Sequence, residues 1–151
     1  MATEIFRIEG LAELEAKLSE IMALGRADTI ARQTLVQAAK TAMEPVLQEV
    51  QTTAPTDTGT LRQSAKLTAR IPNETDRRST MINQTDVAVA VVSVKKSAVS
   101  LAQEFGTKKL APQPFLRPAL ARHKETVVTL FKEDLAEYIN KVAARQARRK
   151  K

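Results

Sequence analysis

The chain has 151 residues and a formal net charge of +7, a length typical of one domain with one hydrophobic core. Apolar residues make up 43% of it but aromatic residues only 3%, so aliphatic side chains must supply most of that core. The absence of cysteine excludes disulfides, thiolate nucleophiles and cysteine metal ligands. The longest apolar run, residues 87–92, is too short to span a membrane, so we expect no membrane partner.

Most of the net charge lies at the C-terminal end. The last seven positions contain no acid and five basic residues: Arg145, Arg148, Arg149, Lys150 and Lys151. These account for five of the seven net positive charges, so the rest of the chain carries only +2. We therefore predict a single α+β domain over residues 1–144 and a flexible basic tail over residues 145–151.

In the N-terminal part, we predict a short strand over residues 3–8 and a helix over about 11–23, where apolar residues recur at helical spacing. A second helix begins near Asp28, a favourable N-cap, and ends before Pro55, because the residue before a proline resists the α conformation. Pro45 lies inside this helix and predicts a kink or break near Ala42.

Two strands are predicted after a turn at residues 54–60. Residues 65–71 alternate between apolar and polar, which is typical of a strand with one solvent-exposed face. Residues 86–94 are apolar at nearly every position, which predicts a strand covered on both faces. Residues 72–85 between them are polar and predict a long mobile loop. An antiparallel pairing, with helices covering one side, is the simplest arrangement.

The C-terminal part predicts a short helix over 98–105 that ends at Gly106, a loop, and a final helix from about Leu116 to Ala144. The final helix has an apolar stripe at helical spacing: Leu120, Val127, Phe131, Leu135, Ile139 and Val142. The predicted fold class is therefore α+β, a single domain in which a small antiparallel sheet packs against two or three long helices.

Few residues could carry catalysis. His123 is the only histidine and fits a partly exposed helical position better than a general base, which needs a nucleophile or acid beside it. Glu133, Asp134 and Glu137 fit a solvated helix face, and the four glycines are too scattered for a nucleotide-binding loop. We expect no catalytic, cofactor or metal site and no enzymatic activity. A hydrolase that uses only carboxylates stays open as an alternative.

Two clusters of residues are more specific. The first, residues 54–64, joins a helix to a strand; Pro55 ends the helix and Gly59 can adopt a positive φ. The second begins with residues 104–107 and continues with residues 112–119, where prolines lower the entropy cost of ordering the loop. Each cluster by itself can be explained by a local structural role. It is the occurrence of both clusters in this order along the chain that indicates a function.

This order resembles the tail-component family of lambdoid siphophages, typified by gene product ten of the Hong Kong phage and related to the minor tail protein Z of lambda. Four blocks carry the resemblance: Gly-x-x-Glu-Leu at residues 10–14, Ala-Pro-x-x-Thr-Gly-x-Leu-Arg-x-Ser at 54–64, Glu-Phe-Gly-Thr at 104–107 and Pro-x-Pro-Phe-Leu-Arg-Pro-Ala at 112–119. Pro45 departs from the continuous helix expected of the family. The candidate interface residues are Pro55, Thr58, Gly59, Leu61, Arg62, Glu104, Phe105, Gly106, Thr107, Pro114, Phe115, Leu116, Arg117 and Pro118.

The resemblance implies a structural virion protein of the neck or tail-completion type, without cofactors. It implies a homo-oligomeric ring of about six or twelve copies at the head–tail junction, around the DNA channel. The implied partners are head-closure proteins and tail-terminator or tail-tube proteins. The implied location is the virion tail or neck, after assembly in the host cytoplasm.

The alternative is a basic DNA-binding accessory protein. Its candidate DNA-facing residues are Arg77, Arg78, Arg145, Arg148, Arg149, Lys150 and Lys151. They could make non-specific contact with packaged DNA, although aromatic residues for base stacking are missing from the region around the strands. A steep loss of DNA affinity with salt would distinguish a DNA binder from a ring-forming protein.

Overall fold

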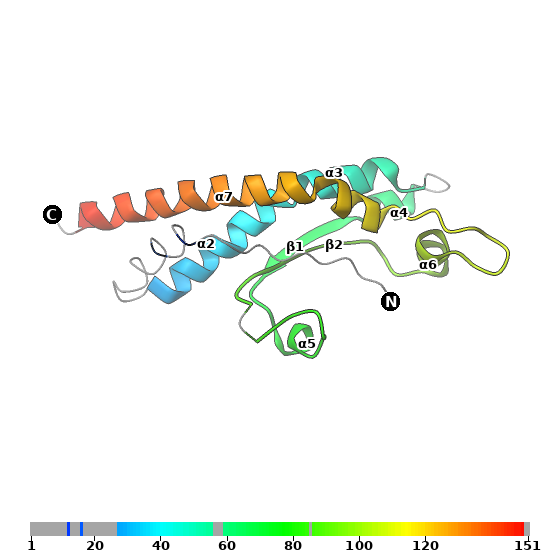
Figure 1. Ribbon diagram of the computed structural model, residues 1–151, viewed down its shortest axis with the longest axis horizontal. Coiled ribbons are helices and arrows are strands. Elements are labelled where there is room, and N and C mark those ends of the chain that lie inside the picture. Colours follow the sequence, from blue (N-terminus) through cyan, green and yellow to red (C-terminus); the bar gives the residue numbers. More distant parts are fainter. Residues whose placement is uncertain (1–11, 13–15, 17–26, 56–58, 85, 150–151) are drawn as a thin grey trace.

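The computed structural model describes residues 27–55, 59–84 and 86–149, together with positions 12 and 16. Its elements are α2 (Ala27–Ala42), α3 (Glu44–Thr53), α4 (Thr60–Gln63), β1 (Lys66–Arg70), α5 (Glu74–Arg77), β2 (Val89–Ser93), α6 (Ala98–Phe105) and α7 (Leu116–Arg149). The long helix α7 packs along α2 and α3, and the two-stranded sheet contacts α2 and α3 (Figure 1). The predicted α+β fold with a small sheet and long helices is confirmed. The strand expected over 3–8 lies outside the described residues, as does the helix expected over 11–23 apart from positions 12 and 16.

The predicted break near Ala42 is confirmed. Helix α2 ends at Ala42, and α3 begins at Glu44 with Pro45 as its second residue. In the first turn of a helix the missing N–H of proline removes no hydrogen bond, so Pro45 fits there without cost. As a result, α2 runs obliquely to α7 whereas α3 follows it (Figure 1).

The core lies where α7 meets α2 and α3. Four members of the predicted stripe on α7 are buried: Val127, Phe131, Leu135 and Ile139. They belong to one cluster with Ala38 and Ala42 on α2 and Val46 and Val50 on α3. The two alanines are completely buried, and their small side chains let α7 approach α2 closely. The predicted apolar stripe of α7 is therefore confirmed.

Helix α7 ends later than its sequence predicts. It continues to Arg149, whereas the expected end was Ala144, where the apolar stripe stops. Alanine, arginine and glutamine are strong helix formers, and arginines near a helix C-terminus interact favourably with the helix dipole. The expected end at Ala144 was therefore wrong. The division into a domain and a tail remains a prediction.

Strands β1 and β2 pair antiparallel, with Lys66 opposite Ser93 and Arg70 opposite Val89. Leu67, Ala90 and Val92 pack against the core, while Val87 and Val91 are 40% and 39% exposed. The prediction that this second strand is covered on both faces is therefore wrong for the described part of the chain. A continuous apolar run does not tell whether the second face is covered by the same chain.

The segment after β1 is also more ordered than predicted. Asn73 and Asp76 form a capping box at the start of α5. Arg70 donates two hydrogen bonds to the carboxylate of Asp76, with N–O distances of 2.7 and 3.1 Å, and the guanidinium of Arg77 donates to three main-chain oxygens at positions 83, 84 and 86. The expected absence of secondary structure in this segment was therefore wrong, because its polar residues cap α5 and bond to main-chain groups. The mobility of the segment stays a prediction.

Candidate functional site

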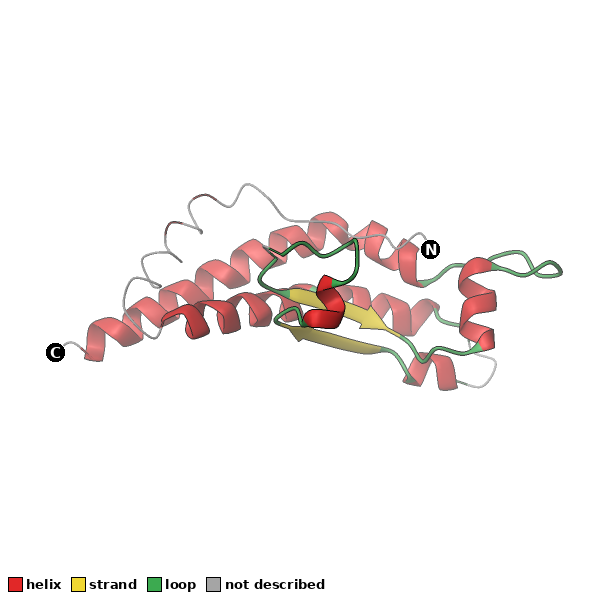
Figure 2. Ribbon diagram, turned by 90° about the horizontal axis from the view of Figure 1, so that it is seen from below, coloured by secondary structure: helices red, strands yellow, loops and turns green. Residues whose placement is uncertain are grey.

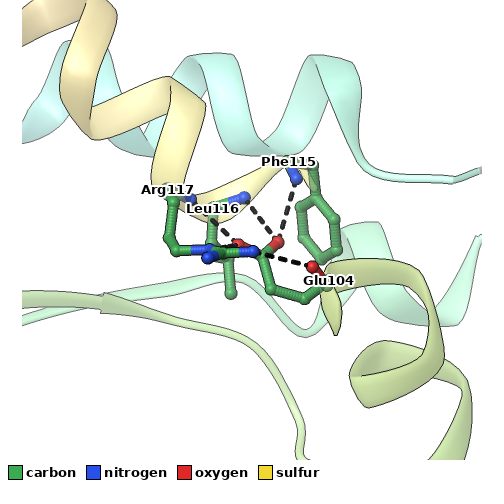
Figure 3. Close-up of polar contacts among 4 residues, drawn as sticks. All are labelled: Glu104, Phe115, Leu116 and Arg117. Atoms are coloured by element: carbon green, nitrogen blue, oxygen red, sulfur yellow. Dashed lines mark hydrogen bonds and ion pairs between the residues drawn. The ribbon is translucent and has the colours of Figure 1, made fainter. Parts of the chain in front are cut away.

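Two of the family blocks meet at Glu104, on the last turn of α6. Its side chain is 5% exposed. One carboxylate oxygen accepts the N–H groups of Phe115 and Leu116 at 2.9 and 3.1 Å, and the other accepts the N–H and the Nε of Arg117 at 3.2 and 2.9 Å (Figure 3). The first N–H groups of a helix have no partner within it, so this one carboxylate caps α7. We call this arrangement the Glu104 clasp.

Arg117 completes the Glu104 clasp. Its Nη2 donates to the main-chain oxygen of Glu104 at 2.9 Å, and its guanidinium lies 5.0 Å from the centroid of the Phe105 ring. Burial raises the pKa of Glu104, but the hydrogen bonds from the Phe115 N–H, from the Arg117 side chain and from the next two N–H groups together outweigh it. The pKa of Glu104 is therefore below its ordinary value, and the carboxylate is charged at neutral pH.

Residues 106–114, which we call the arm loop, are stiffened by their own main chain. Gly106 has a φ of +75°, and a Cβ there would lie 2.9 Å from the main-chain oxygen of Leu110 and 2.9 Å from Pro112. The Thr107 N–H donates to the Leu110 oxygen at 2.8 Å, and the Thr107 hydroxyl accepts the N–H groups of Lys109 and Leu110. Only glycine fits this position, because it tolerates the positive φ and has no Cβ.

The arm loop projects from one end of the molecule (Figure 2). Residues 107–114 are all exposed. Leu110 in the loop and Phe105, the last residue of α6 beside it, are large apolar residues that are 42% and 43% exposed. Phe115 is by contrast 4% exposed and belongs to the core. The two blocks therefore contain residues with two roles. Glu104, Phe115 and Arg117 fix the ends of the arm loop to the rest of the fold, and the exposed residues of the loop are available for contact with another molecule.

The first block closes another helix end. Gly59 has a φ of +67°, and Arg62 Nη2 donates to the main-chain oxygens of Thr52 and Ala54 at 3.0 and 3.2 Å. These oxygens lie at the end of α3, where carbonyls lack helical partners and a positive charge is favoured. Helix α4, which carries Arg62, lies at the same end of the molecule as α6 (Figure 1). The block at 54–64 and the block at 104–107 therefore lie at the same end.

The remaining candidate interface residues have different positions. Pro55 and Leu61 are half-buried, and Pro118 is the third residue of α7, where its missing N–H removes no helical bond. Thr58 lies outside the described residues. Their assignment to an interface remains a prediction.

The candidate DNA-facing residues are dispersed. Arg77 is half-buried and occupied with the main-chain oxygens described above, whereas Arg78 is exposed. Exposed arginines occupy the last turns of α7: Arg145, Arg148 and Arg149. Lys150 and Lys151 lie outside the described residues. A DNA-contacting role for any of them remains a prediction.

Glu49 on α3 has a role that the sequence does not signal. It pairs with Arg122 at 2.6 Å and with His123, both on α7. Burial raises the pKa of Glu49, but its hydrogen bonds with Arg122 and His123 outweigh this, and the pKa is lowered. Glu49 and Arg122 are 73 residues apart in the chain, so no local pattern could pair them. His123 is thus half-buried and in contact with the carboxylate of Glu49.

Among the described residues, no group of three or more histidine or carboxylate side chains could hold a metal ion. The same part of the chain contains no helix that is long and apolar enough to cross a membrane.

Comparison with known proteins identifies one family. No curated protein and no solved structure matches the chain. A family model described as "Bacteriophage HK97-gp10, putative tail-component" matches residues 12–106, which is more than half of the chain. The matched range begins inside the block at 10–14, includes the block at 54–64 and the first three residues of the block at 104–107, and ends before the block at 112–119. The chain therefore belongs to the HK97-gp10-like family of bacteriophage tail components.

Proposed function

We propose that this chain is a non-enzymatic neck or tail-completion protein that forms a homo-oligomeric ring at the head–tail junction. Membership of a tail-component family supports a structural role in the virion. One repeated heterologous contact closes a ring when the rotation between neighbouring copies divides a full turn. Head-closure proteins on one side and tail-terminator or tail-tube proteins on the other are the proposed neighbours, with DNA passing through the ring.

The observation that carries this proposal is the combination of rigidity and exposure in the arm loop. The Glu104 clasp fixes its base, Gly106 and Thr107 fix its shape, and its exposed residues contribute little to the core of their own chain. A loop that is already ordered loses little entropy on binding, and the exposed Phe105 and Leu110 supply apolar area for contact. We therefore assign the arm loop to the contact between neighbouring copies.

The test replaces one exposed apolar residue in the arm loop and a matched one elsewhere. Leu110→Asp changes a side chain that is 42% exposed, and Ile71→Asp changes one beyond β1 that is 41% exposed. We expect L110D to abolish the ring, measured by the mass of the assembled oligomer, and to leave heads without tails when it replaces the normal protein during infection. The control I71D should retain both. Normal rings and tailed particles with L110D would contradict the proposal.

A DNA-binding accessory protein is the second candidate, favoured by the exposed arginines on the last turns of α7. Such a protein would bind duplex DNA as a free monomer, with an affinity that falls steeply with salt. A discrete oligomeric mass in the absence of DNA favours the ring instead.

A further inference from the structure

The two strands, helix α4 and the first part of α6 come from two stretches of sequence that contain no acidic residue. Residues 58–73 and 87–103 lack aspartate and glutamate altogether. Their basic residues are Arg62, Lys66, Arg70, Lys95 and Lys96. A region of one charge sign creates a positive potential over the surface that it forms.

Only some of these basic groups are free for a ligand. Arg70 is paired with Asp76, and Arg62 is bonded to the carbonyls at the end of α3. Lys66, Lys95 and Lys96 are exposed, and none of them forms an ion pair with a carboxylate of the described residues. Three ammonium groups of this part of the chain therefore remain uncompensated.

The strand register brings two of these lysines, Lys66 and Lys95, to one face, and Lys96 is the next residue in the chain. Lys66 lies opposite Ser93, and both are exposed. Lys95 follows Ser93 by two residues, and its N–H donates to the Ser64 hydroxyl at 3.0 Å. Side chains two residues apart in an extended chain point the same way, so Lys66 and Lys95 share the outer face at the end of the sheet that joins α4 and α6 (Figure 1). We call Lys66, Lys95 and Lys96 the basic sheet end.

A shallow hollow of about 510 Å³ adjoins this surface. Lys66 lines it together with Lys40 and Glu44, and Glu44 is the only acidic residue among the described residues of its lining. Lys40 therefore adds a fourth basic group beside the basic sheet end, against one carboxylate.

The chemistry of the surface specifies the ligand. Clustered lysines without carboxylate partners fit the closely spaced phosphates of a nucleic-acid backbone. The two acid-free stretches also contain no aromatic residue, so they offer no platform for stacking unpaired bases. Contacts limited to phosphates position a protein on a duplex without reading its sequence.

We propose that the basic sheet end binds the phosphate backbone of duplex DNA without sequence preference. This inference rests on the proposed ring function and deepens it by naming the face of each copy that is turned toward the DNA channel. It also moves the expected DNA contact away from Arg77, whose guanidinium is occupied with main-chain oxygens of its own loop.

The test compares two variants of the full chain with equal loss of charge. Lys66→Gln with Lys95→Gln removes two lysines of the basic sheet end, and Lys124→Gln with Lys132→Gln removes two exposed lysines of α7. Binding to a fluorescent duplex of mixed sequence is measured by anisotropy between about 50 and 200 mM salt. We expect the slope of log affinity against log salt to become shallower by about 2 in the first variant, since each phosphate contact contributes about 0.9. The control should keep the wild-type slope.

Equal slopes for the two variants, or no salt-dependent binding by the wild type, would overturn the inference. The oligomeric mass of the same samples separates this result from the ring proposal. If rings form normally and the two variants have equal salt slopes, only the proposed DNA binding by the basic sheet end is rejected. A selective loss of slope without any ring, alone or in particles, supports the DNA surface and rejects the proposed ring.

Discussion

The two ends of α7 are held by different physical forces. Its middle and later part packs through apolar side chains against α2 and α3, and this burial is distributed over many residues. Its first turn depends on the charged carboxylate of Glu104, which accepts four hydrogen bonds from three consecutive residues. A distributed apolar contact responds to changes in volume, whereas a contact concentrated in one carboxylate responds to charge and pH. The arm loop, which we propose makes the ring contact, is held by the second kind of contact, through the carboxylate of Glu104.

The largest effect is expected in the apolar part. Leu135 is 2% exposed and among the largest fully buried side chains. Leu135→Ala should lower the free energy of unfolding by about 2 to 5 kcal/mol, because it removes buried methyl groups and leaves a cavity. Denaturant unfolding measures this, with the exposed Leu110→Ala as a control that should change stability by less than about 0.5 kcal/mol. A similar small loss for both variants would refute the comparison.

Removing the charge of the Glu104 clasp should have a smaller and more local effect. Glu104→Gln keeps the shape of the side chain but weakens its bonds to α7, each of which joins an N–H group to a charge. We expect a loss of about 1.5 to 3 kcal/mol in the protection of the Phe115, Leu116 and Arg117 amides, measured by hydrogen exchange. Glu133→Gln on the exposed face of α7 serves as the control and should leave these amides unchanged.

Acid tests the same contact independently. Because the pKa of Glu104 is lowered in the fold, the unfolded chain binds more protons than the folded chain below about pH 4.5. The contribution of the carboxylate is therefore complete above its ordinary pKa and is lost as the pH falls through the lowered value. Protection of the three amides should decrease with acid in the wild type and not in E104Q. Parallel pH profiles for the two proteins would contradict this origin of the protection.

The smallest effects concern the two glycines with positive φ. Gly59→Ala should cost about 1 kcal/mol through backbone strain alone, because a Cβ there meets no atom of the described residues closer than 3.9 Å. Gly106→Ala should cost about 2 kcal/mol, because the same strain is joined by contacts of 2.9 Å with the arm loop. Thermal unfolding compares the two. Equal losses would show that the arm loop yields to the added methyl group.

Much of the framework followed from patterns within a few residues. Pro45 predicted the break between α2 and α3, the apolar stripe predicted the buried face of α7, and alternation predicted β1. The family blocks predicted the family. The roles of the charged residues did not follow in this way. Glu104 was assigned to a candidate interface, and only the fold shows that its carboxylate turns inward to α7.

The sequence by itself determined where the chain can bend, which helix face is apolar and which family the chain resembles. These properties depend on backbone restrictions and on side-chain periodicity, which act over a few neighbouring residues. Only the tertiary structure decided how the charges are used: Glu49 meets Arg122 across 73 positions, and strand pairing places Lys66 opposite Ser93, two residues before Lys95. Such choices depend on distances in space, because a charge is stabilised by whichever partner the fold brings within a few ångströms.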